Sequence, residues 1–155
     1  MIGYTAPYSG TDQDKYTHTI GIVSDSRTIR SVLNIYVKQL TVCKTVLLFS
    51  CGGEMEYLGK GHRFDLVIID VRMSFHKTIP LFRALKAQGI PILACADPDF
   101  ESRRRELVKA GVTEIISDAV EFWEFQLRCL TLLKLGRQQR QLETFRRWSH
   151  QAVTR

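Results

Sequence analysis

The sequence predicts an α/β fold, a doubly wound parallel sheet of five strands with an extended C-terminal helix. Five short apolar segments alternate along the chain with segments whose apolar residues recur at helical spacing. The segments 66–69 and 91–95 are continuous apolar runs, which is typical of strands covered by helices on both faces. Right-handed crossovers between such strands give a parallel sheet, with its ligand crevice at the carboxyl ends of the strands.

Each expected strand is an apolar run that ends at polar or turn-forming residues. The first run ends at the Ser-Asp-Ser sequence of 24–26, the third ends at Asp70, and the fourth is followed by Asp97 and a proline. The five runs cover residues 20–23, 45–49, 66–69, 91–95 and 115–116.

Each expected helix is indicated by apolar residues three, four or seven positions apart. A turn at 51–53 precedes a short helix over 55–58. The helix after the fourth strand is expected to point Leu107 and Val108 inward and to stop at Gly111. The apolar faces expected for the first and third helices are Ile29, Val32, Leu33, Tyr36 and Leu40, and Ile79, Phe82 and Leu85, respectively.

Length and composition are those of one globular domain. The chain has 155 residues, of which 45% are hydrophobic and 25% charged. No apolar run approaches the roughly 18 residues of a membrane span, and the first residues are polar, so we expect a cytoplasmic protein that does not enter the membrane. The cysteines lack metal-ligand spacing and are expected to be reduced; they are Cys43, Cys51, Cys95 and Cys129.

We divide the chain into a flexible leader over 1–18, a domain over 19–133 and a projecting helical linker or dimerisation segment over 134–155. The net charge of +6 is concentrated in this last segment, where six lysines and arginines face one acid, Glu143. No nucleic-acid-binding motif accompanies these charges, which favours a solvated helix face over nucleic-acid binding.

The last helix is expected to run from about residue 119 to 148, which is ~45 Å at a rise of 1.5 Å per residue. A small sheet cannot cover that length, so the distal half should project. Its thinly spaced apolar residues are typical of a two-stranded seam and predict a homodimer or a connector to a downstream output domain. These residues are Leu135, Leu142, Phe145 and Trp148. The alternative is a tail that folds back on its own domain through Phe145 and Trp148.

Acidic residues follow several of the expected strands and should share one rim of the sheet. Asp25 follows the first strand, Asp70 the third, Asp97 the fourth and Asp118 the fifth. A carboxylate at a strand end can accept a phosphoryl group if a second carboxylate holds Mg²⁺ beside it, because the metal neutralises the phosphoryl oxygens. The rim therefore predicts phosphate and metal chemistry.

From about residue 18 to 133 the sequence resembles the receiver domain of two-component response regulators, which are CheY-like proteins with a flavodoxin-like fold. The resemblance rests on the motifs at 23–26, 66–73, 90–93, 110–112 and 115–118. It implies that Asp70 accepts phosphate from a histidine kinase. It further implies that Mg²⁺ binds to Asp25, Asp70 and the backbone carbonyl of Arg72.

Three positions depart from the pattern of that family. Ser24 stands where the family usually has the first of two acidic residues, which weakens one metal ligand. Ala96 replaces the hydroxyl residue that bonds the phosphoryl group, and alanine has no such group. Asp118 replaces the lysine that follows the fifth strand, so the sign of a charge beside the phosphate is reversed, which opposes a further dianion by about 4 kcal/mol at 4 Å and an effective dielectric of 20.

These departures favour a pseudo-receiver, a non-enzymatic signalling domain of a two-component or second-messenger pathway that is controlled by protein contacts with a histidine kinase or another signalling protein. A second hypothesis keeps Asp70 as a phosphorylated acceptor in a phosphorelay, with Mg²⁺, and with Arg72 or Lys77 supplying the missing cation. A third hypothesis is an enzyme that hydrolyses phosphate esters at the acidic rim. It is the weakest, since no His or Ser pair with the spacing of a catalytic base accompanies that rim.

Overall fold

The computed structural model describes residues 18–73, 75–117 and 120–153. Its strands form one parallel sheet in the order β2-β1-β3-β4-β5. They are β1 (His18–Val23), β2 (Cys43–Phe49), β3 (Leu66–Asp70), β4 (Ile92–Ala96) and β5 (Glu114–Ser117). The predicted doubly wound, five-stranded α/β fold is therefore confirmed. The segment 1–17, which the sequence assigns to a flexible leader, lies outside the described residues.

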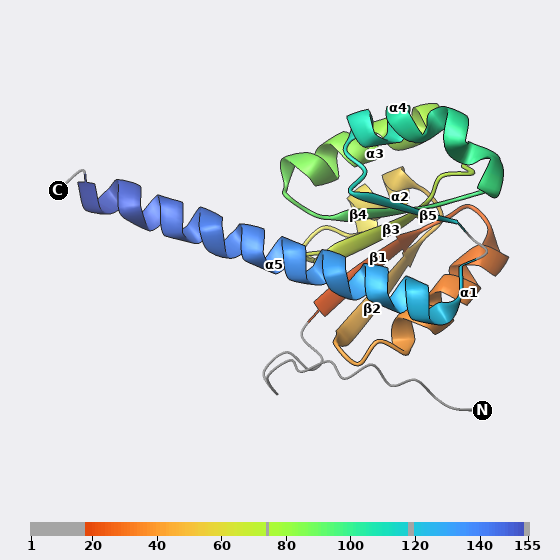
Figure 1. Ribbon diagram of the computed structural model, residues 1–155, viewed down its shortest axis with the longest axis horizontal. Coiled ribbons are helices and arrows are strands. Elements are labelled where there is room, and N and C mark those ends of the chain that lie inside the picture. Colours follow the sequence, from red (N-terminus) through yellow and green to blue (C-terminus); the bar gives the residue numbers. More distant parts are fainter. Residues whose placement is uncertain (1–17, 74, 118–119, 154–155) are drawn as a thin grey trace.

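Helices cover both faces of this sheet (Figure 1). They are α1 (Arg27–Lys38), α2 (Gly52–Leu58), α3 (Phe75–Ala87), the 3₁₀ helix η2 (Pro98–Arg103), α4 (Arg104–Ala110) and α5 (Phe122–Val153). One face is covered by α1 and α5 through residues such as Val37 and Phe125. The other is covered by α2, α3 and α4 through Met55, Phe82 and Leu107. Both β3 and β4 are consequently buried along their whole length.

Local sequence fixes the ends of several helices. The Ser26 hydroxyl accepts a hydrogen bond from the Ile29 amide and caps α1. At its C-terminus, α4 ends before Gly111, whose φ of 114° lies in the left-handed region that glycine adopts without strain. These caps lie where the sequence signals predicted helix boundaries.

Three local predictions were wrong. Val108 is 57% exposed because only one side of the short helix α4 faces the sheet. The fully buried Leu107 takes that side, and Val108 lies about 100° further around the helix. Val32 is exposed for the same reason, since Leu33 takes the inward position. Gly52 and Gly53, which were predicted to lie in a turn at 51–53, belong to α2. This helix begins at Gly52, directly after the extended Cys51.

The long helix α5 leaves the domain as a projecting rod (Figure 1). Its buried residues end at Gly136, whereas Phe145 is 72% and Trp148 is 75% exposed. The alternative of a tail folded back through these two aromatics is therefore wrong. The helix also ends later than predicted, at Val153, and begins at Phe122. Among the described residues no helix combines the length and apolarity that a membrane crossing requires.

Candidate functional site

The carboxyl ends of the strands meet at one edge of the sheet, as the sequence predicts for a parallel arrangement. Ser24 directly follows β1, Asp70 is the last residue of β3, and Ala96 is the last residue of β4. All three are buried. The fourth predicted member of this rim, Asp118, lies outside the described residues.

Among the carboxylates that the structure describes at this edge, Asp70 is the most enclosed, with 1% of its surface exposed. Its Oδ2 accepts a hydrogen bond of 2.8 Å from the Ser24 hydroxyl. Its Oδ1 accepts two more from Arg72, one from the backbone N–H at 3.1 Å and one from the side-chain Nε at 2.8 Å. Both carboxylate oxygens are thus engaged by groups of the protein itself.

Arg72 places a guanidinium at the mouth of the site. Its Nη1 lies 3.5 Å from the Asp97 Oδ1, so one arginine bridges the ends of β3 and β4. The side chain is 23% exposed, while its partner Asp70 is almost fully buried. Removing one member of such a pair is costly, because the remaining charge stays in a poorly solvated place. The cation that neutralises Asp70 is therefore built into the turn that follows β3.

Ser24 is held in place from both sides. Its hydroxyl accepts a 3.1 Å hydrogen bond from the Ser26 amide while it donates to Asp70. Its carbonyl accepts a hydrogen bond from the Arg30 guanidinium. A neutral hydroxyl that donates to Asp70 thus occupies the place where the receiver family usually has an acid.

The predicted magnesium ligands Asp25 and Asp70 differ sharply in their surroundings. Asp25 is exposed, and its backbone N–H donates to the Met73 Sδ at 3.1 Å. A divalent cation on the Asp70 Oδ1 would have to displace the Arg72 Nε or accept a positive neighbour, and hard cations prefer several anionic oxygens. The side chains present therefore do not fit Mg²⁺. Within 18–73, 75–117 and 120–153, no group of three or more His, Cys, Asp or Glu residues is arranged to hold a metal ion.

A second polar cluster lies at the opposite, amino edge of the sheet and was missed by the sequence reasoning. The Asp65 carboxylate accepts a 2.9 Å hydrogen bond from the Thr19 amide and lies 3.1 Å from the Arg140 Nη2 of α5. The His18 Nδ1 lies 3.6 Å from the same carboxylate. Burial alone would raise the pKa of Asp65, but the bonds from His18 and Thr19 and the charge of Arg140 outweigh it, so this pKa is lowered. Only the fold brings these distant residues together.

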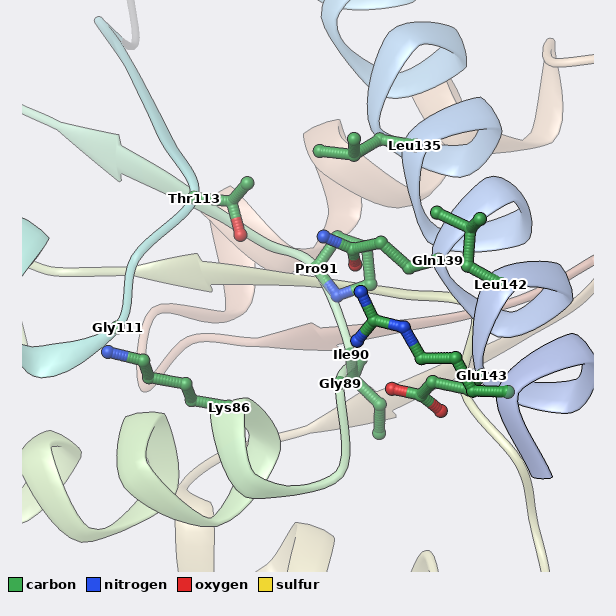
Figure 2. Close-up of a pocket in the computed structure, with 11 residues that line it drawn as sticks. Lys86, Gly89, Ile90, Pro91, Gly111, Thr113, Leu135, Gln139, Leu142 and Glu143 are labelled. Carbon is green, nitrogen blue, oxygen red and sulfur yellow. The ribbon is translucent and has the colours of Figure 1, made fainter. Parts of the chain in front are cut away.

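Close packing accompanies this cluster. A Cβ added to Gly136 of α5 would come within 2.9 Å of the Pro91 Cγ, which is closer than real Cβ contacts. The helix therefore passes tightly over the start of β4. Beyond that point, a groove of about 480 Å³ opens between α5 and the segment 89–91, with Lys86 of α3 at its edge (Figure 2).

Comparisons with solved structures agree with the predicted resemblance. The receiver domain of response regulator 1452 from Francisella matches with a TM-score of 0.63 and 19% identity, over 76% of this chain and 98% of that one. A CheY-like receiver protein from Methanospirillum hungatei JF-1 matches with a TM-score of 0.67 and 16% identity, over 79% and 98%. An adenylate cyclase from Rhodopirellula baltica matches with a TM-score of 0.71 and 16% identity, over 84% and 98%.

No family model matches the sequence, and no curated protein matches it. The likeness therefore lies in the structure, and at such identities it establishes the fold. That fold is the one of response-regulator receiver domains.

Proposed function

We propose that this chain is a receiver-like signalling domain that operates without phosphorylation of Asp70. The observation that carries the proposal is the engagement of both oxygens of that carboxylate, which accept hydrogen bonds from the Ser24 hydroxyl and from Arg72. A nucleophilic carboxylate needs a lone pair directed at the phosphorus and a metal that draws the phosphoryl group towards it. Here the Arg72 guanidinium, not a metal, is the cation beside that carboxylate.

The buried Ala96 supports the same reading. A phosphoryl group on Asp70 would meet a methyl group at the end of β4 instead of a hydroxyl, so the contact that couples phosphorylation to a shift of the neighbouring strands is lost. Control then falls to protein contacts. The partners would be a histidine kinase or another cytoplasmic signalling protein, a second copy of the chain, and an output module reached through α5. The domain itself performs no catalysis.

The test is a titration with Mg²⁺ and beryllofluoride, a phosphoryl mimic, followed by NMR of the amides around Asp25, Asp70 and β4. We expect no saturable shift at millimolar ligand, and no adduct by intact mass after incubation with acetyl phosphate. Saturable, magnesium-dependent shifts that spread to β4 and β5, absent in Asp70→Asn, would overturn the proposal.

A gain-of-function variant makes this negative result informative. Ser24→Asp, Ala96→Thr and Asp118→Lys together restore the residues that the receiver pattern places at these positions. We expect this triple variant, further substituted by Arg72→Ala to release Asp70, to bind beryllofluoride in the presence of Mg²⁺. Arg72→Ala alone is the matched control and should not bind.

One observation favours a second candidate function. The Arg72 Nε lies 2.8 Å from the Asp70 Oδ1 and so supplies a cation beside the carboxylate, as a phosphoacceptor site requires. If Arg72 swings aside to clasp an incoming phosphoryl group, Asp70 is a working acceptor. In that case the wild-type protein forms the acetyl phosphate adduct and Arg72→Ala does not.

A further inference from the structure

The distal half of α5 exposes a set of bulky apolar side chains to solvent. Every large apolar residue after Gly136 belongs to it, and each is more than half exposed. These residues are Leu142, Phe145, Trp148 and Val153, and Leu135 just before them is also exposed. A stripe of this size on a charged helix marks an interaction surface.

The spacing of these residues follows a heptad. If Leu135 and Leu142 take position a, Phe145 takes d, Val153 takes e and Trp148 takes g. Positions b, c and f in the same stretch hold no large apolar residue but include Arg137, Arg140 and Arg147. All five apolar side chains therefore fall on the four positions that face a partner helix in a two-stranded coiled coil.

The domain is held by a neighbouring side of the helix, whose buried residues occupy positions b, e and f. Leu133, Gly136 and Arg140 occupy positions f and b of this register and pack on the sheet or bind Asp65. The buried Phe125 and Leu132, earlier in α5, extend this side to position e. The seam also begins where the helix leaves the domain. One heptad earlier, position a is held by Arg128, which pairs with Glu114 and Glu124 of its own domain. After Leu132, the residues that hold the domain and the apolar residues of the seam therefore occupy different positions.

We propose that the partner on this seam is a second copy of the chain, bound through α5 as a parallel, in-register coiled coil. This inference rests on the homodimer included in the proposed function and assigns its geometry. The charges are compatible with the parallel arrangement, because flanking residues at g and the following e positions pair Lys134 with Gln139, Gln141 with Arg146, and Trp148 with Val153. No like charges meet in these pairs, and the last is an additional apolar contact.

The same arrangement completes the groove beside α5. Its α5 wall is formed by Leu135 and Leu142 at position a, by Gln139 and Arg146 at position e, and by Glu143 at position b. Figure 2 shows Leu135, Gln139, Leu142 and Glu143 on this wall. Because e positions flank the seam, the helix of the second copy lies along the mouth of the groove. Its g residues, Lys134 and Gln141, face the opening. In the dimer each groove is therefore lined by both copies.

Two polar seam positions tune the strength of this contact. Gln138 at d and Ser149 at a replace apolar residues in a stretch of only about three heptads. Such polar seam residues specify register at a cost in stability. We expect a dimer that dissociates in the micromolar range, and its formation should follow concentration in light scattering.

Disulfide crosslinking tests the arrangement directly. In the full chain carrying Cys51→Ser, which removes the exposed native thiol, Leu142→Cys and Ser149→Cys are each oxidised under mild conditions. A parallel, in-register pair places both a positions next to their equivalents, so both variants form covalent dimers. An antiparallel pair can bring only one of two positions seven residues apart opposite itself. Arg147→Cys, at f, is the matched control and should stay monomeric.

The outcomes test the homodimer and its parallel register separately. Crosslinking of one a position alone overturns the parallel register but keeps the homodimer. A strict monomer in light scattering at tens of micromolar overturns the homodimer and leaves the beryllofluoride result untouched. As a second variant, Phe145→Glu should abolish the dimer while the melting of the domain is unchanged, and Arg147→Glu should alter neither.

Discussion

An aspartate lies at each end of β3, Asp65 directly before it and Asp70 as its last residue, and both aspartates pair with an arginine. At the carboxyl edge, Asp70 is bound by Arg72 from the next turn of the chain. At the amino edge, Asp65 is bound by Arg140, which arrives on α5 from the other end of the sequence. The first pair neutralises the buried carboxylate of the candidate site, whereas the second ties the projecting helix to the sheet. Similar chemistry thus serves a local and a long-range purpose.

The two pairs differ in burial, and this should give the largest difference in unfolding free energy between variants. Arg72→Ala leaves the Asp70 carboxylate, 1% exposed, without its cation and should lower the free energy of unfolding by about 2–4 kcal/mol. Asp65 is more exposed than Asp70, and in Arg140→Ala it is still bound by the Thr19 amide. A loss of about 1 kcal/mol in the free energy of unfolding is therefore expected. Urea unfolding of the two variants measures both values. A larger loss for Arg140→Ala would show that the carboxyl edge is not the more sensitive one.

Packing at the amino edge can be tested by replacing Gly136 with alanine and comparing the effect with the same substitution at Gly53. Gly136→Ala puts a methyl group against the Pro91 ring, and we expect overpacking of about 1–3 kcal/mol to exceed the gain of about 1 kcal/mol in helix propensity. Gly53→Ala, in α2, meets no atom within 4 Å and should stabilise the protein by about 0.5 kcal/mol. Thermal melting should therefore move in opposite directions. Equal shifts would mean that α5 is not tightly seated on β4.

The comparison of the two edges also shows what sequence reasoning can reach. The carboxyl rim was predictable, because Ser24, Asp70 and Ala96 each follow an apolar run and the ends of parallel strands meet. The pairing of Arg72 with Asp70 was not predicted: the sequence offered Arg72 or Lys77 only as the cation that would assist a phosphorylated Asp70, since a guanidinium two residues away has many rotamers. No signal in the sequence links Asp65 to Arg140, because that contact depends on how far α5 travels before it leaves the sheet.

Protonation offers a finer test of the amino edge. The folded-state pKa of Asp65 is lowered from its ordinary value of 3.8, so its contribution to stability is complete above that value and is lost as the pH falls through the lower, folded-state pKa. The difference in unfolding free energy between the wild type and Asp65→Asn should therefore be constant from pH 8 to about pH 5 and shrink below about pH 4. A difference that instead grows in acid would contradict the pairing with Arg140.

The smallest effect expected concerns two cysteines at opposite ends of β2. Cys51 is exposed at the carboxyl edge, whereas Cys43 begins the strand at the amino edge, where burial and, more weakly, the charge of Asp65 raise the pKa of its thiol to about 11. At pH 8 the thiolate fraction of Cys43 is then about a hundredfold lower than for a thiol with the reference value of 9.0. Iodoacetamide should alkylate Cys51 first, as mass spectrometry of the native protein would show. Asp65→Asn removes one of the causes and should speed the reaction of Cys43 by a small factor without changing that of Cys51. Faster reaction at both cysteines would indicate that the variant loosens the whole domain, and the electrostatic link between Asp65 and Cys43 would then be wrong.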